Sequence, residues 1–109
     1  MIIVEMNEGQ KIDYEVQNTA TKKKITFDDD LTINLAKREE DWPVHIDVCY
    51  DEDRELVLGT AAGRAYVAQI DIPARRYNEE ADPDDPEQTI LVPVALDLDT
   101  VTLSLWSIE

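Results

Sequence analysis

The sequence is poor in cysteine, histidine and glycine and has no long apolar run, and these shortages exclude several classes of protein. A single cysteine, Cys49, cannot form a disulfide within the chain or build a metal cage from several thiolates. No apolar segment approaches the roughly 18 residues of a membrane span. The N-terminal MIIVEM has neither the basic residues nor the cleavage site of a secretory signal. We therefore expect a protein of the reducing cytoplasm that does not bind membranes.

Basic residues are also scarce, since 10 Lys and Arg stand against 25 Asp and Glu, for a formal net charge of -15. This charge opposes direct binding to nucleic acids and to anionic membrane surfaces. Hydrophobic residues nevertheless make up 43% of the chain, an ordinary share for a globular protein. We expect one domain, residues 1–109, in which the acidity is added to a normal core.

Apolar and polar residues alternate with a period of two in short segments, which is typical of β-strands with one buried face. The segments that show it most clearly are 12–16, 25–27, 31–35, 44–50 and 66–72. Polar or turn-forming clusters separate these segments. The sequence therefore predicts an all-β fold, an antiparallel two-sheet β-sandwich of about seven to nine short strands, with a partly open β-barrel as the alternative.

Several local features refine this expectation. The acidic triplet Asp28–Asp30 lies between two alternating segments and predicts a hairpin. Only residues 36–42 have a helical composition, and there we expect a single turn. The segment 90–108 is too long for one typical strand, so we expect a break near 97–100 and a terminal hairpin. Pro93 predicts that its strand lies at a sheet edge or a bulge.

The most unusual segment is EEADPDDPE, which holds six carboxylates within nine residues. We expect it to form an exposed, Pro-containing loop at about 75–89, because carboxylates at this density need solvent, a cation or a basic partner. The segment lacks the ligand spacing of an EF-hand. It is the sequence's speculative partner-binding or cation-binding loop, with calcium as the cation that would suit it. The residues concerned are Glu79, Glu80, Asp82, Asp84, Asp85 and Glu87.

A second group of chemically capable side chains lies on one predicted strand, where His45, Asp47 and Cys49 alternate and so project from one face. His45 and Asp47 are near enough to share a metal ion and are weak candidates for metal ligands, but two ligands do not make a site. No catalytic residue is predicted, because neither serine stands in a G-x-S-x-G nucleophile motif and no other catalytic set is evident.

These observations favour a small, non-catalytic interaction or structural module that binds another protein through the acidic loop or an unpaired strand edge. One alternative is a divalent-cation or small-ligand binding protein that uses the acidic loop. A second alternative is an acidic DNA mimic, since 25 carboxylates on a compact surface approximate a polyanion. Strand order, oligomeric state and partner identity stay open at this stage.

Overall fold

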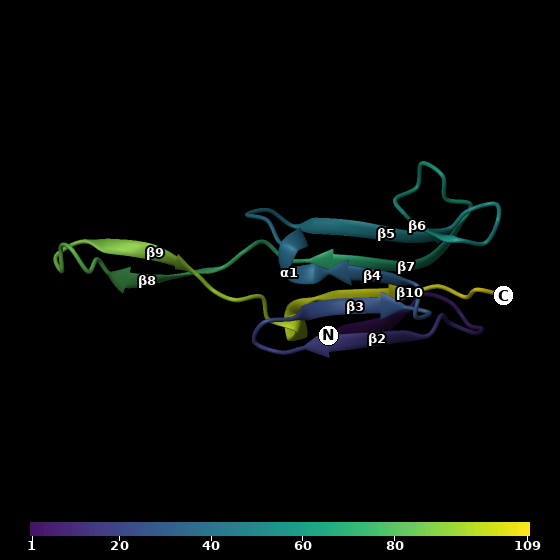
Figure 1. Ribbon diagram of the computed structural model, residues 1–109, viewed down its shortest axis with the longest axis horizontal. Coiled ribbons are helices and arrows are strands. Elements are labelled where there is room, and N and C mark those ends of the chain that lie inside the picture. Colours follow the sequence, from purple (N-terminus) through teal and green to yellow (C-terminus); the bar gives the residue numbers. More distant parts are fainter.

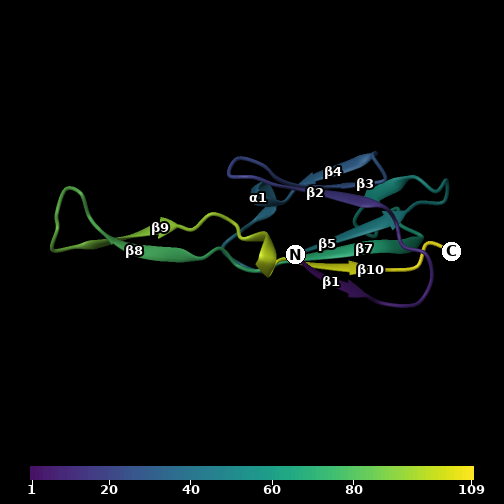
Figure 2. The same ribbon diagram turned by 90° about the horizontal axis from the view of Figure 1, so that it is seen from below.

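The computed structural model describes all 109 residues, which form a two-layer body and a two-stranded arm (Figure 1). The molecule measures 59 × 25 × 23 Å. Two views at right angles show the arm extending from one end of the body, clear of both layers (Figures 1 and 2). The elongated shape is therefore due to the arm.

Sheet A, the larger layer, has five strands in the order β1, β10, β7, β5 and β6. Strand β1 runs parallel to β10, and the other neighbours are antiparallel. The longest strand, β7, is central and is paired along both edges. The bounds are Ile2–Glu5 for β1, Thr102–Leu105 for β10, Ala65–Ile72 for β7, Val44–Tyr50 for β5 and Leu56–Leu58 for β6.

Sheet B is a three-stranded antiparallel meander of β2 (Tyr14–Asn18), β3 (Lys23–Phe27) and β4 (Leu31–Asn34). The predicted hairpin at the acidic triplet is confirmed, since it joins β3 to β4. Asp28 and Asp29 have φ values of 52° and 51°, and the Asp30 amide donates to the Phe27 carbonyl at 3.0 Å. Two successive left-handed residues form the type I′ turn that matches the twist of paired strands.

The core lies between the two sheets, and the predicted all-β sandwich is confirmed, with sheets that do not close into a barrel (Figure 2). Ile25, Phe27 and Ile33 of sheet B are almost completely buried. Sheet A contributes the alternate residues of β5, β7 and β10 that share a face in the cross-strand register. These inner-face residues are Ile46, Val48, Ala68, Ile70, Ile72, Leu103 and Leu105.

Helical structure is limited to the one-turn helix α1 (Leu35–Arg38) and the 3-10 turn η1 (Leu98–Thr100). Neither has the length and apolar character needed to cross a bilayer. Helix α1 begins one residue before the predicted turn, where the Asn34 side chain accepts the Lys37 amide at 3.2 Å. This is a normal N-cap contact, because the first amides of a helix lack partners within it.

The predicted terminal hairpin is wrong, although the break near 97–100 is confirmed. Strand β9 (Thr89–Pro93) pairs with β8 (Tyr77–Ala81) in the arm, whereas β10 pairs with β1 and β7 in sheet A. Between β9 and β10 the chain buries Leu96, Leu98 and Val101 in the core. Burial of these side chains carries the chain back into the body, so β9 and β10 belong to different sheets.

The segment 12–16 predicted a strand with one buried apolar face, and only part of that face is buried. Ile12 is buried, but it precedes β2, and Val16 within that strand is 39% exposed. Strand β2 is an edge strand of sheet B. An alternating pattern predicts a strand there but not how much of its apolar face is covered.

Tight packing in the connection between β6 and β7 generates a stability prediction. A Cβ atom added at Gly63 would lie 2.7 Å from Cys49 Cβ and 2.9 Å from its Sγ. We expect Gly63→Ala to lower the free energy of unfolding by about 1–3 kcal/mol, because the side chains must shift to relieve the overlap. Urea denaturation measures this change. Ala62→Ser, at an exposed position of the same connection, is the control and should change it by less than about 0.5 kcal/mol. Equal stabilities for the two variants would contradict the packing argument.

Candidate functional site

The β8–β9 arm is, with the edge strand β1, the most exposed part of the sheet structure. Every residue of β8 is exposed, as is every residue of β9 except the half-buried Val92. Leu91 is 64% exposed, and Tyr77 and Ile90 are also exposed large hydrophobic residues. No residue between Ile72 and Leu96 is buried. A two-stranded sheet without a layer packed on it is at best marginally stable in water, so this surface lacks the support that other strands receive.

The arm corrects the expectation of a loop at 75–89. Glu79 and Glu80 lie within β8, and the turn itself is only the segment 82–88. Asp82 and Asp85 stabilise this turn, because their carboxylates accept the amides of Asp84 at 2.9 Å and Glu87 at 3.2 Å. The remaining acids, Glu79, Glu80, Asp84 and Glu87, make no side-chain hydrogen bond or ion pair within the chain. All four are exposed.

The base of the arm is fastened to the segment that precedes β5. The Arg75 amide donates to the Glu40 carbonyl at 2.8 Å, and its guanidinium donates to the Glu39 carbonyl at 2.9 Å. Arg75 Nη1 also lies 3.2 Å from Asp41 Oδ1, and the Tyr77 hydroxyl donates to the same carboxylate. These contacts, which we call the base clamp, hold the arm in one direction relative to the body.

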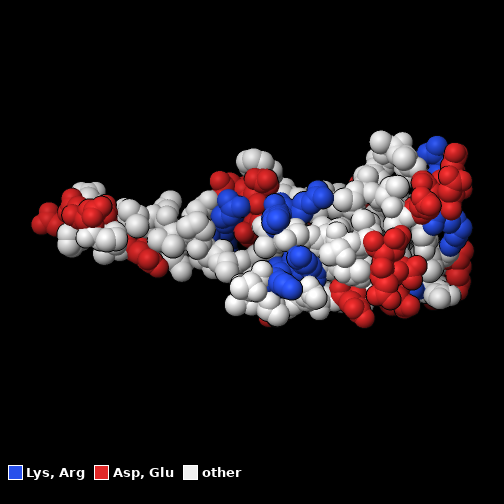
Figure 3. All heavy atoms as spheres, in the orientation of Figure 1, with Lys and Arg blue, Asp and Glu red and all other residues white.

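Most of the basic side chains gather where the arm leaves the body, as Figure 3 shows. Two of them, Lys23 and Arg75, line a surface groove of about 350 Å³ together with Pro93. Only Arg75 among them forms an ion pair within the chain. We call this group the cationic collar. It contains seven of the ten basic residues, because α1 contacts β3 and the arm begins beside them. They are Lys22, Lys23 and Lys24 around the start of β3, Lys37 and Arg38 of α1, and Arg75 and Arg76 before β8.

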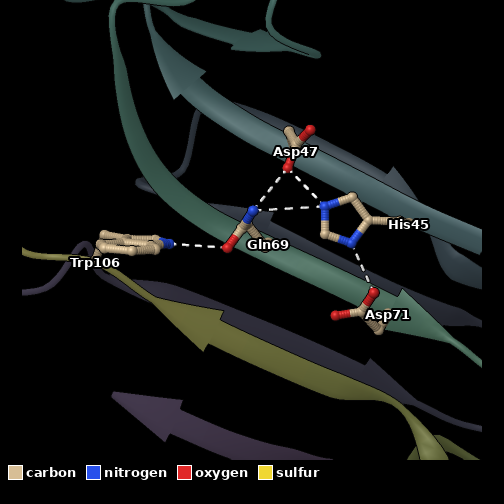
Figure 4. A network of polar contacts seen from close by, with 5 residues as sticks. All are labelled: His45, Asp47, Gln69, Asp71 and Trp106. Carbon is tan, nitrogen blue, oxygen red and sulfur yellow. Dashed lines mark hydrogen bonds and ion pairs between the residues drawn. The ribbon is translucent and has the colours of Figure 1, made fainter. Parts of the chain in front are cut away.

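A polar network lies on the face of sheet A that points away from the core (Figure 4). His45 Nδ1 lies 2.6 Å from Asp71 Oδ1, and its Nε2 lies 2.7 Å from Asp47 Oδ1. The Gln69 side chain donates from Nε2 to Asp47 Oδ1 at 3.0 Å, and its Oε1 accepts the Trp106 indole N–H at 3.0 Å. The network thus joins β5, β7 and the residue that follows β10.

The carboxylates on both sides of His45 favour its charged form. The hydrogen bond with Asp71, and then that with Asp47, raise the pKa of His45 above its ordinary value of 6.5. The hydrogen bond from Gln69 lowers the pKa of Asp47. An imidazolium donates from both nitrogens and keeps no lone pair for a metal ion. His45 and Asp47 are therefore brought together as expected, but as a hydrogen-bonded pair.

Cys49, the third alternating residue of β5, is buried, because it packs beside Gly63 in the connection between β6 and β7. Burial raises the pKa of its thiol, which keeps it protonated and unreactive. No group of three or more His, Cys, Asp and Glu side chains is arranged to hold a metal ion.

Sequence reasoning missed the partners of His45. Gln69 and Asp71 alternate on β7 and so share a face, which is a visible signal. The register places Asp71 opposite His45 and Gln69 opposite Asp47. That pairing follows from strand order, which no local pattern contains. The chain was compared with family models, curated proteins and solved structures, and none of them matches it.

The network generates a prediction about pH. We expect His45, the single histidine, to titrate above pH 6.5 in the folded protein and to fall toward that value in Asp71→Asn. Because the folded pKa is raised, the network's contribution to stability is complete below pH 6.5 and is lost as the pH rises through the folded pKa. Ring-proton NMR measures the pKa, and denaturation across this range measures the stability.

A variant at the tip of the arm provides the control. Asp85→Asn changes a carboxylate that accepts the Glu87 amide in the turn and should leave the His45 pKa unchanged. A wild-type His45 pKa at or below 6.5 would show that the two carboxylates do not hold the charged ring.

Proposed function

We propose that this protein is a non-catalytic interaction module that binds another protein through the β8–β9 arm, residues 77–93. The observation that carries the proposal is that the arm contributes nothing to the core while the base clamp holds it clear of the body. An isolated hairpin gains little stability by itself. A directed hairpin with an exposed Leu91 is therefore best explained by a partner that covers it.

The arm offers two free strand edges for such a partner. The Asp82 amide donates to the Gln88 carbonyl, and the Val94 amide donates to the Arg76 carbonyl. Since hydrogen-bonded pairs alternate along an antiparallel ladder, Ile90 and Val92 direct their backbone groups toward β8. Thr89, Leu91 and Pro93 then direct theirs to the free edge of β9. An open edge of this kind supports recognition by β-strand addition.

The distribution of charge favours this proposal over a DNA mimic. On the face in view, acidic side chains gather in separate groups on the arm tip, beside the cationic collar and at the opposite end of the body (Figure 3). A mimic would present acids in a continuous row, like phosphates along a strand. The proposal also places the protein in a reducing compartment such as the cytoplasm, because its one cysteine is buried and has no disulfide partner.

Deleting the arm tests the proposal. We expect replacement of residues 78–92 by a short glycine-containing turn to keep the body folded, since no core residue is removed. The midpoint of thermal unfolding should change by only a few degrees, which is the shift that about 1 kcal/mol produces. Affinity capture from the native organism, read by mass spectrometry, should lose its specific partners.

A matched control separates the arm from general acidity. Neutralising Asp51, Glu52 and Asp53, an exposed or half-buried acidic turn of the body, should leave capture unchanged. Partners retained by the arm deletion, or lost equally in this control, would show that the arm is not the binding surface.

A further inference from the structure

We propose that the partner of the arm is a second copy of this chain. In this dimer the two β9 strands pair antiparallel about a twofold axis, and each acidic tip contacts the cationic collar of the other copy. The inference rests on the proposed function of the arm and adds the identity of its partner. Three features support it: the complementary charges of the arm tip and the collar, the free edge of β9, and the length of the arm.

The charges on the arm and on the body are complementary. The tip segment 79–87 holds six carboxylates and no basic residue. The collar holds seven basic residues, and six of them have no ion pair within a chain that carries 25 carboxylates. Within the chain, Glu39 and Asp41 pair only with Arg75 of the collar. A second copy brings its six tip carboxylates to the basic residues that have no ion pair.

The charges also decide the orientation of the two arms. If the arms lay parallel, their acidic tips would meet and repel one another. When they lie antiparallel, each tip points toward the body of the other copy, where that copy's collar surrounds the base of its arm. A twofold axis produces this contact at both ends at once, because an isologous interface uses the same surfaces twice.

The edge of β9 is better suited to pairing than the edge of β8. Strand β8 carries Glu79 and Glu80, whereas TILVP of β9 has no charged side chain. With the axis at Leu91, each Leu91 exchanges backbone hydrogen bonds with its copy, and each Thr89 amide donates to a Pro93 carbonyl. Pro93 needs only to accept in this arrangement. The most exposed apolar side chain of the arm, Leu91, meets its copy across the axis.

The length of the arm matches this arrangement. Leu91 lies three residues from Gln88, where the turn 82–88 joins β9, or roughly 10 Å along an extended strand. The same distance beyond the axis leads to Val94 of the other copy, whose amide donates to the Arg76 carbonyl at the start of that arm. Two hairpins joined in this way make a four-stranded sheet, which exceeds the two strands that are marginal alone.

Analytical ultracentrifugation of the full chain tests the dimer. We expect a reversible monomer–dimer equilibrium that added salt shifts toward monomer, because exposed charges are screened. Reversing the tip with Asp84→Lys and Asp85→Lys should reduce the dimer fraction several-fold. Adding Arg38→Glu and Arg76→Glu to that variant should restore it. A chain that stays monomeric at all concentrations, or a reversal that the second pair does not rescue, would overturn the proposal.

Cysteine cross-linking tests the position of the axis. Leu91→Cys places two thiols on residues with Cα atoms about 5.5 Å apart, within disulfide range, so mild oxidation should give a covalent dimer. Thr89→Cys is the matched control, because the two Thr89 residues would lie about 13 Å apart, beyond that range. The native Cys49 is buried and does not compete. Cross-linking of both variants to the same extent, or of neither, would reject this pairing.

The two proposals fail in different ways. If the chain stays monomeric but arm-dependent capture of a different protein persists, the proposed dimer is wrong and the proposed interaction function stands. If neither self-association nor capture depends on the arm, the interaction function fails as well.

Discussion

Burial of the inner face of β7 between β5, β10 and sheet B is the interaction on which the rest of the structure depends. Ile70 and Ile72 are almost completely buried, and the register places Ile70 between Ile46 and Leu103. Each fully buried aliphatic side chain contributes about 1.5–3 kcal/mol. An exposed ion pair such as Arg75 with Asp41 contributes only about 0–1 kcal/mol. The core therefore holds the body together, and the surface charges are available for other roles.

Burial of the inner face of β7 also explains the polar network on the outer face of sheet A. Successive side chains of a strand point to opposite faces, so burial of Ile46, Ile70 and Ile72 leaves His45, Gln69 and Asp71 on the outer face. There they satisfy one another and the Trp106 indole. The network joins β5 to β7 and β10 on the side that the core does not reach. Its carboxylates raise the pKa of the one histidine.

The hydrophobic burial that holds the body together does not extend to the arm. Its strands alternate weakly, are rich in acids and have no second layer. Its only anchors are the base clamp and the return of the chain to the core at Leu96. It is therefore the part of the molecule that we propose for contact with another chain.

Local pattern predicted much of the body and little of the arm. The alternation at 44–50 and 66–72 indicated the central strands, since one face of each is fully covered. It indicated β2 but not the exposure of Val16, because an edge strand has less of its face covered. The acids at 79–87 suggested a loop, since clustered carboxylates disfavour a buried strand. They do not disfavour an exposed one, and Glu79 and Glu80 lie in β8.

By itself, the sequence determined the all-β class, the turn at Asp28–Asp30, the edge position of the strand that contains Pro93 and the acidity of 79–87, because each depends on neighbouring residues. Tertiary structure decided which strands pair, that the acids stand on a projecting arm, and that His45 meets Asp71. It also assembled the cationic collar from three segments distant in the chain. Those features depend on burial between residues far apart in sequence, and a local pattern contains no information about which distant segments share a core.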